Sequence, residues 1–173
     1  MDLELKSNML VSICTITYNH AKFIRQALDG FLMQETNFPF EVLIHDDAST
    51  DGTADIIREY AEKYPDIIKP IFQKENQYSK GVQISLTYNF PRVKGKYVAL
   101  CEGDDYWTDP RKLQTQVDFL EANPEFSMCF HPVTVRYEDG SSPDSDYPAK
   151  NRYPLYTGRC VFDVYDLITT NFN

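Results

Sequence analysis

The sequence predicts an α/β fold, a mostly parallel β-sheet flanked by helices. Short apolar runs of strand length alternate with segments whose apolar residues recur at helical spacing, and three of those runs end in polar residues. Open parallel sheets bind their ligands at such carboxyl ends of strands. The chain has 173 residues, of which 42% are hydrophobic and 14% aromatic, enough for a core of normal size.

The apolar patterns place the elements in order. Strands are expected at residues 10–16, 41–44, 67–72, 97–101 and 127–137, and helices at residues 23–32, 56–64, 84–90 and 110–123. Helix capping is expected from Asn19 for the first helix, from Ser49, Asp51 and Thr53 for the second, and from Asp109 for the helix that begins at Pro110. The strand at 97–101 should be buried on both faces. Residues 138–152 read as a polar loop, and 161–169 as an apolar segment of unassigned type.

Composition excludes several classes of protein. The formal net charge is −9, and no Lys/Arg cluster is long enough to follow a nucleic-acid backbone, so nucleic acid is not an expected partner. The four cysteines, Cys14, Cys101, Cys129 and Cys160, form no CxxC pair, which favours buried thiols over a zinc site. The sequence shows no signal peptide and no apolar run of transmembrane length. We therefore expect a cytoplasmic location, with peripheral association at the inner face of the membrane left open.

Three polar clusters should converge at one edge of the sheet. They follow the first, second and fourth strands, and consist of Thr17, Tyr18 and Asn19, then Asp46 and Asp47, then Asp104 and Asp105. An aromatic ring can stack on a base, and a carboxylate can accept a hydrogen bond from a base N–H. A second carboxylate can hold Mg²⁺ or Mn²⁺ against phosphates. Together these groups suit a nucleoside diphosphate.

The same segments resemble family 2 glycosyltransferases, which have the Rossmann-like GT-A fold. Residues 11–19 (VSICTITYN) resemble the family's first strand, and residues 46–53 (DDASTDGT) its second-strand signature. Residues 95–105 (GKYVALCEGDD) are similar to the strand that leads to its acidic metal motif, and residues 106–113 continue the match. The resemblance covers residues 10 to about 130.

The resemblance implies a role for each matched residue. Tyr18 would flank the nucleobase, Asp47 would accept its imide N–H, and Asp104 would face the ribose or the donor sugar. Asp105 would coordinate the Mg²⁺ or Mn²⁺ that bridges the phosphates. Thr17 and Asn19 complete the nucleotide-sugar-binding set.

The resemblance also implies an inverting, metal-dependent transfer from a UDP- or dTDP-type sugar to an acceptor hydroxyl. The acceptor would be a saccharide, a lipid-linked sugar or a protein, in the synthesis of a surface polysaccharide or glycoconjugate. Residues 1–137 would form the donor-binding core, and 138–173 a polar loop and the start of a truncated acceptor-binding part. No carboxylate after Asp105 stands in a recognised base motif, so we expect the general base beyond Asn173.

Structural alternatives accompany these roles. Tyr18 could pack against the helix that follows it, Asp46 could only bind loop amides, and Lys80 could be a surface residue. His45 is expected in the core. Tyr106 and Trp107 could line the pocket or anchor the core.

Other functions are weighed against sugar transfer. A nucleotidyltransferase would carry a glycine-rich loop after its first strand, and residues 17–22 contain no glycine. A phospho-acceptor domain would carry an acidic pair there. A nucleotide-binding domain without transfer activity stays open.

Overall fold

The computed structural model describes residues 9–147, which fall into two compact units. The first extends to Glu125 and the second begins at Phe126, and each is described by itself. The first unit contains a four-stranded parallel sheet in the order β3-β2-β1-β4. Its strands and α-helices are β1 (Val11–Thr17), α1 (Ile24–Leu32), β2 (Phe40–Asp46), α2 (Thr53–Lys63), β3 (Ile68–Phe72), β4 (Tyr97–Leu100) and α3 (Lys112–Ala122). The α/β class with a parallel sheet is therefore confirmed.

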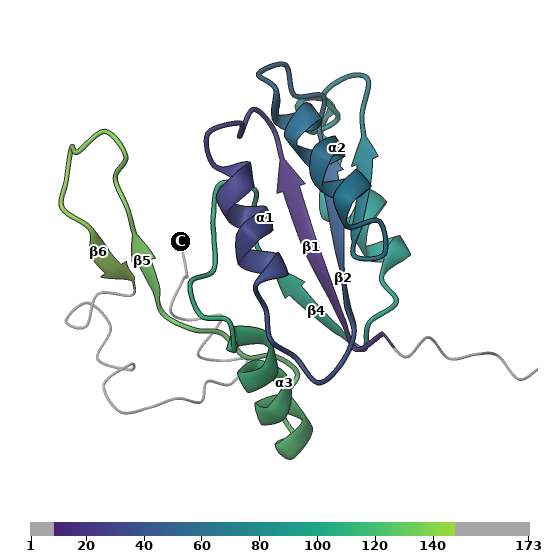
Figure 1. Ribbon diagram of the computed structural model, residues 1–173, viewed down its shortest axis with the longest axis vertical. Helices are drawn as coiled ribbons and strands as arrows, with labels where there is room; N and C mark the ends of the chain where they lie inside the picture. Colours follow the sequence, from purple (N-terminus) through teal and green to yellow (C-terminus); the bar gives the residue numbers. More distant parts are fainter. Residues whose placement is uncertain (1–8, 148–173) are drawn as a thin grey trace, which may run out of the picture. The chain divides into compact units, whose positions relative to one another are not determined.

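Helices α1 and α2 cover one face of this sheet (Figure 1). Ile13 in β1 lies between Val42 of β2 and Ala99 of β4, and these paired residues share that face. The predicted apolar stripe of α1 packs on it, with Leu28 and Phe31 fully buried. The core thus lies between β1 and β2 on one side and α1 and α2 on the other.

Trp107 belongs to this core. Its side chain is buried, and its ring meets Phe31 edge-on with the ring centroids 5.0 Å apart. The predicted inner face of α3 is buried as well, through Leu113, Val117 and Leu120. Of the two roles weighed for Trp107, the structure shows core anchor.

Strand β4 differs from its prediction, because it is not buried on both faces. Val98 and Leu100 are 45% and 65% exposed. These two residues alternate with the half-buried Tyr97 and Ala99, so one face of β4 is exposed. Within the described residues β4 also pairs with β1 alone, at the edge of the sheet. Its four consecutive apolar residues are also compatible with a central strand, and the sequence does not distinguish a central strand from one at the edge of the sheet.

The helix starts also needed correction. Asn19 does not cap α1, whose N-cap residue is Phe23. Helix α2 begins after Gly52, which has a φ of +98°, and the Asp51 carboxylate accepts the Thr53 backbone N–H at 3.0 Å. The Asp109 carboxylate accepts the Arg111 N–H at 2.8 Å. Helix α3 begins at Lys112, two residues later than the predicted start at Pro110.

The segment between β3 and β4 is irregular. It contains a 3₁₀ turn, η1 (Tyr78–Lys80), a π-helical turn, η2 (Ser85–Asn89), and a second 3₁₀ turn, η3 (Phe90–Arg92). The short helix expected at residues 84–90 is therefore present as η2. This segment contacts β1 and β2 through η2, and it contributes to the site described below.

The second unit contains an antiparallel pair, β5 (Val133–Val135) and β6 (Ser145–Tyr147). The strand expected at 127–137 is three residues long, and its partner β6 lies inside the expected loop 138–152. Both predictions for this region were wrong in extent. Segment 161–169 and Cys160 lie outside the described residues. The proposed functional boundary after residue 137 stays a prediction.

Candidate functional site

An open pocket of about 900 Å³ lies at the carboxyl ends of β1 and β2. This volume is typical of sites for small molecules and cofactors. The residues after β1 and β2 and one residue after β4 form part of the wall, and residues 76–86 form the rest. The lining includes Ile16, Thr17, Tyr18, His20, Asp47, Asn76, Tyr78, Ser79, Val82, Ile84, Leu86 and Glu102.

Tyr18 and Thr17 line this pocket as expected for a site. Tyr18 is 45% exposed, so its ring is not used up in packing against α1. Thr17 is fully buried, and its Oγ1 has no hydrogen-bond partner among the described residues. It lies beneath Gly103, whose backbone N–H donates to the Ile16 carbonyl at 3.0 Å.

Asn19 is occupied by the neighbouring loop, and it is not among the pocket-lining residues. Its backbone N–H donates to Ser49 Oγ, and its Oδ1 accepts the Thr50 N–H, both at 2.9 Å. Asn19 has a φ of +56°, a conformation that Asn tolerates better than most residues. The side chain joins the loop after β1 to the loop after β2. Its predicted contact with the donor stays a prediction.

The two aspartates after β2 are both buried and have different partners. Asp46 Oδ2 accepts the Ser49 N–H at 3.1 Å, the loop-ordering contact expected for it. Asp47 lines the pocket, and its carboxylate accepts two backbone N–H groups, from Gln77 at 2.8 Å and Tyr78 at 2.9 Å. Each carboxylate oxygen has a second lone pair, so Asp47 keeps capacity for a ligand N–H.

The acidic turn after β4 brings three carboxylates close together. The Asp105 N–H donates to the Glu102 carbonyl at 3.2 Å, and the Asp104 carboxylate lies 3.7 Å from His20 Nε2. Burial first and the charge of Asp104 second raise the pKa values of Glu102 and Asp105. A cation at this turn would relieve the repulsion.

The acidic turn fits a metal held jointly with a ligand. In the part of the chain that the structure describes, no group of three or more His, Cys, Asp or Glu residues is placed to hold a metal ion by itself. Mg²⁺ bound to phosphates commonly takes only one or two protein carboxylates, with the remaining positions filled by phosphate and water. Asp105 and its neighbours supply hard oxygen donors of this kind.

Sequence reasoning missed the wall formed by residues 76–86. Tyr78 and Leu86, 76% and 58% exposed, line the pocket from this segment. Lys80 instead pairs with Glu75 at 2.9 Å, which agrees with a surface role. The only local signal was Gly81, which has a φ of +79° and ends η1.

His45 packs against the segment between β3 and β4 through Tyr88. It is fully buried, stacks on Tyr88 at a centroid distance of 4.7 Å, and has its Nε2 3.1 Å from the Gln73 side-chain amide. The expected core role of His45 is confirmed.

Comparison with known proteins identifies the family. The family described as Glycosyl transferase family 2 matches residues 12–171. The chain therefore belongs to glycosyltransferase family 2. An uncharacterized protein from Mycobacterium tuberculosis is 52% identical over 138 residues, covering 80% of this chain and 39% of that protein. WfaP from Escherichia coli, a UDP-Glc:alpha-D-GlcNAc-diphosphoundecaprenol beta-1,3-glucosyltransferase, is 34% identical over 117 residues, covering 68% of this chain and 43% of WfaP.

Solved structures show the same fold. The crystal structure of S. aureus TarS 1–349 in complex with UDP has a TM-score of 0.54 and 28% identity, covering 67% of this chain and 33% of that one. The mannosyltransferase PcManGT from Pyrobaculum calidifontis, in complex with GDP-Man and Mn²⁺, has a TM-score of 0.56 and 29% identity, covering 66% and 33%. The GT-A fold is thereby confirmed.

Two further facts concern the length of the chain and its helices. The chain spans about two fifths of the length of the curated relatives described above. None of the helices in the described part of the chain has the length and apolar character needed to cross a bilayer.

Proposed function

We propose that this chain is the donor-binding part of an inverting, metal-dependent glycosyltransferase that uses a UDP- or dTDP-type sugar. One observation carries the proposal: a single pocket at the carboxyl ends of the strands is lined by Tyr18, Asp47 and Glu102, next to the acidic turn. WfaP takes UDP-Glc by its name, and the TarS structure holds UDP, which supports a uridine donor.

The base and the sugar have separate places in this proposal. The Tyr18 ring flanks the nucleobase, and Asp47 uses its free lone pairs to accept the imide N–H that uracil and thymine both offer. Asp104, on the acidic turn, faces the ribose or the donor sugar. Thr17 and Asn19 shape the floor and the loop beside it.

Charge in the pocket argues for a cation. The described residues that line it include the acids Asp47 and Glu102 and neither lysine nor arginine. A diphosphate placed against these carboxylates needs a positive charge between them, and we assign Asp105 to hold Mg²⁺ or Mn²⁺ there. Such a cation stabilises the negative charge that develops on the leaving nucleoside diphosphate. The Mn²⁺ in the PcManGT complex supports this assignment.

Acceptor activation is assigned elsewhere. We assign the general base to none of the donor-binding residues, because no carboxylate after Asp105 stands in a recognised base motif. Its expected position beyond Asn173 stays a prediction. The acceptor is a saccharide, a lipid-linked sugar or a protein. The name of WfaP, which includes a diphosphoundecaprenol-linked sugar, supports surface-glycan synthesis.

Thermal stabilisation tests the proposal. The purified chain is melted with UDP, dTDP, GDP and ADP, each with and without Mn²⁺. UDP or dTDP should raise the melting temperature only with Mn²⁺, and Asp105→Asn should remove the effect. Asp66→Asn, an exposed acid on the α2–β3 connection, is the matched control and should behave as wild type. Indifference of the wild-type chain to every nucleotide would overturn the proposal.

A further inference from the structure

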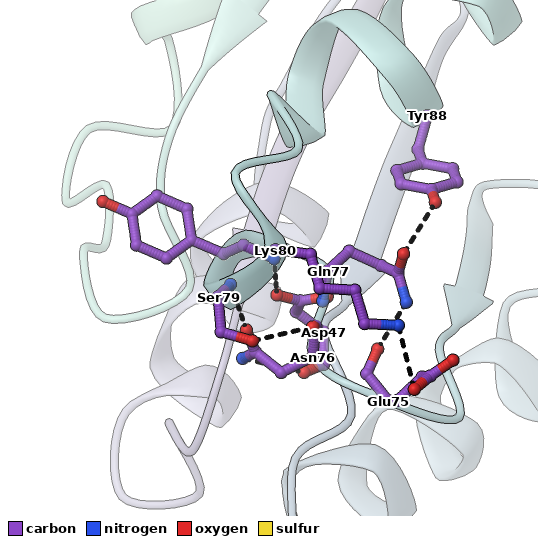
Figure 2. Close-up of polar contacts among 8 residues, drawn as sticks. Asp47, Glu75, Asn76, Gln77, Ser79, Lys80 and Tyr88 are labelled. Atoms are coloured by element: carbon purple, nitrogen blue, oxygen red, sulfur yellow. Dashed lines mark hydrogen bonds and ion pairs between the residues drawn. The ribbon is translucent and has the colours of Figure 1, made fainter.

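Residues 76–81 form a compact turn at the mouth of the pocket. Asn76 Oδ1 accepts the Ser79 N–H at 2.7 Å, and the Ser79 hydroxyl donates back to the Asn76 carbonyl at 3.0 Å. The Gly81 N–H closes the turn on the Tyr78 carbonyl at 2.9 Å. Figure 2 shows Asn76 and Ser79 beside Asp47. The turn is therefore ordered within itself, and its position depends on what joins it to the sheet.

Asp47 makes that connection. Its two carboxylate oxygens accept the N–H groups of Gln77 and Tyr78, and its backbone carbonyl accepts the Asn76 side-chain amide at 3.3 Å. The Asp47 side chain is 1% exposed, so these charge-assisted bonds have little competition from water. Removing either oxygen would leave a partly buried N–H without its acceptor.

Tyr78 is the residue whose placement these bonds control. Its N–H is bound by Asp47, while its ring is 76% exposed and lines the pocket. Tyr18 lines the same pocket from the loop after β1. An exposed ring gains little from the fold itself, whereas a ring at a ligand pocket is available for stacking on a planar base.

We propose that Tyr78 is a second nucleobase-stacking residue, and that Asp47 positions it through the two backbone hydrogen bonds. This inference rests on the proposed function, because it names how the same pocket holds the base. Asp47 would then raise the affinity for the base by holding the 76–81 turn in place, in addition to any direct hydrogen bond to the base.

Nucleotide binding tests the stacking role. In the presence of Mn²⁺, Tyr78→Ala should weaken UDP binding by about tenfold or more, while Tyr78→Phe, which keeps the ring, stays within about twofold of wild type. Lys80→Ala in the same turn, outside the pocket lining, is the control and should not change affinity. Because Tyr78 is exposed, its substitution should not unfold the chain, and the melting temperature of each ligand-free variant checks this.

Hydrogen exchange of the free protein tests the positioning role without any ligand. Asp47→Asn should speed exchange of at least one of the Gln77 and Tyr78 backbone amides by about tenfold or more, because the Asn side chain offers one acceptor oxygen in place of two. Asp46→Asn, which alters the neighbouring carboxylate and its bond to Ser49, should leave those two amides unchanged.

A double-mutant cycle joins the two roles. If Asp47 acts through Tyr78, the factor by which Asp47→Asn weakens UDP binding should be at least about threefold smaller in the Tyr78→Ala background. Equal factors in both backgrounds, unchanged amide exchange in Asp47→Asn, or wild-type UDP affinity in Tyr78→Ala would each overturn the inference. A wild-type chain that binds no nucleotide would instead overturn the proposed function.

Discussion

His20 Nε2 lies 3.7 Å from Asp104 Oδ2, so the loop after β1 touches the acidic turn after β4. Gly103 makes this approach possible. A Cβ on Gly103 would lie 2.8 Å from Thr17 Cβ and 3.0 Å from His20 Nδ1, closer than real Cβ atoms come to such neighbours. The acidic turn and the loop that carries Tyr18 are therefore packed as one unit.

Gly103→Ala should damage both stability and the site. The added methyl group has no room above Thr17, and overpacking of this kind costs about 1–3 kcal/mol. Urea denaturation should show the loss, and Mn²⁺-dependent UDP binding should weaken with it, because the turn must move away from β1. Wild-type stability and affinity together would show that the turn is free to shift.

Glu41→Ala should separate stability from binding. The buried Glu41 carboxylate accepts the Ser12 hydroxyl at 2.8 Å and the Lys94 N–H at 3.2 Å, near the amino ends of β1 and β2 and far along the strands from the pocket. Losing this acceptor should cost about 2 kcal/mol of unfolding free energy. UDP affinity of the folded variant should stay within about twofold. A large loss of affinity would mean that the two ends of the sheet are coupled.

Stability should fall below pH 6.5 because of His45. Burial lowers the pKa of His45 below its ordinary value of 6.5, so the unfolded chain takes up this proton at higher pH than the native one does. Below pH 6.5 the unfolded state therefore binds more protons, and the free energy of unfolding falls as pH falls. Urea denaturation from pH 7.5 to 5 should show a shallower decline in His45→Gln than in wild type. Identical slopes would contradict the assignment.

Cys14 and Cys101 should resist alkylation in the folded protein. Burial raises the pKa of Cys14 to about 11 and that of Cys101 to about 12, so little thiolate is present at neutral pH. Iodoacetamide labelling followed by peptide mass spectrometry should find both unmodified until denaturant is added. Rapid labelling in native buffer would show that the structure opens at that cysteine, within β1 for Cys14 or directly after β4 for Cys101.

Periodicity and motif spacing were sufficient for the parallel sheet, for α1 and α2, and for the meeting of Tyr18 and Asp47 in one pocket. Those features depend on short-range patterns and on the rule that parallel strands end at one edge. The capping role of Asn19 was wrong because its backbone N–H donates to Ser49 Oγ and its side-chain oxygen accepts the Thr50 N–H. No local pattern reports contacts between residues so far apart in the sequence.

The wall at residues 76–86 was not predicted for a related reason. The backbone N–H groups of Gln77 and Tyr78 are satisfied by the side chain of Asp47 instead of a regular ladder. The part of the wall before residue 84 therefore carries no periodicity that predicts it. Likewise, the four apolar residues of β4 do not reveal that Val98 and Leu100 are exposed, since burial depends on what packs against that face among the described residues.

A structure of the chain with UDP and Mn²⁺ bound would decide whether this pocket holds the donor. The uracil is expected in the pocket beside Tyr18, with an Asp105 oxygen about 2.1 Å from a cation that also binds the diphosphate. A nucleotide bound away from this pocket, or a cation held without Asp105, would rule out the assigned donor site.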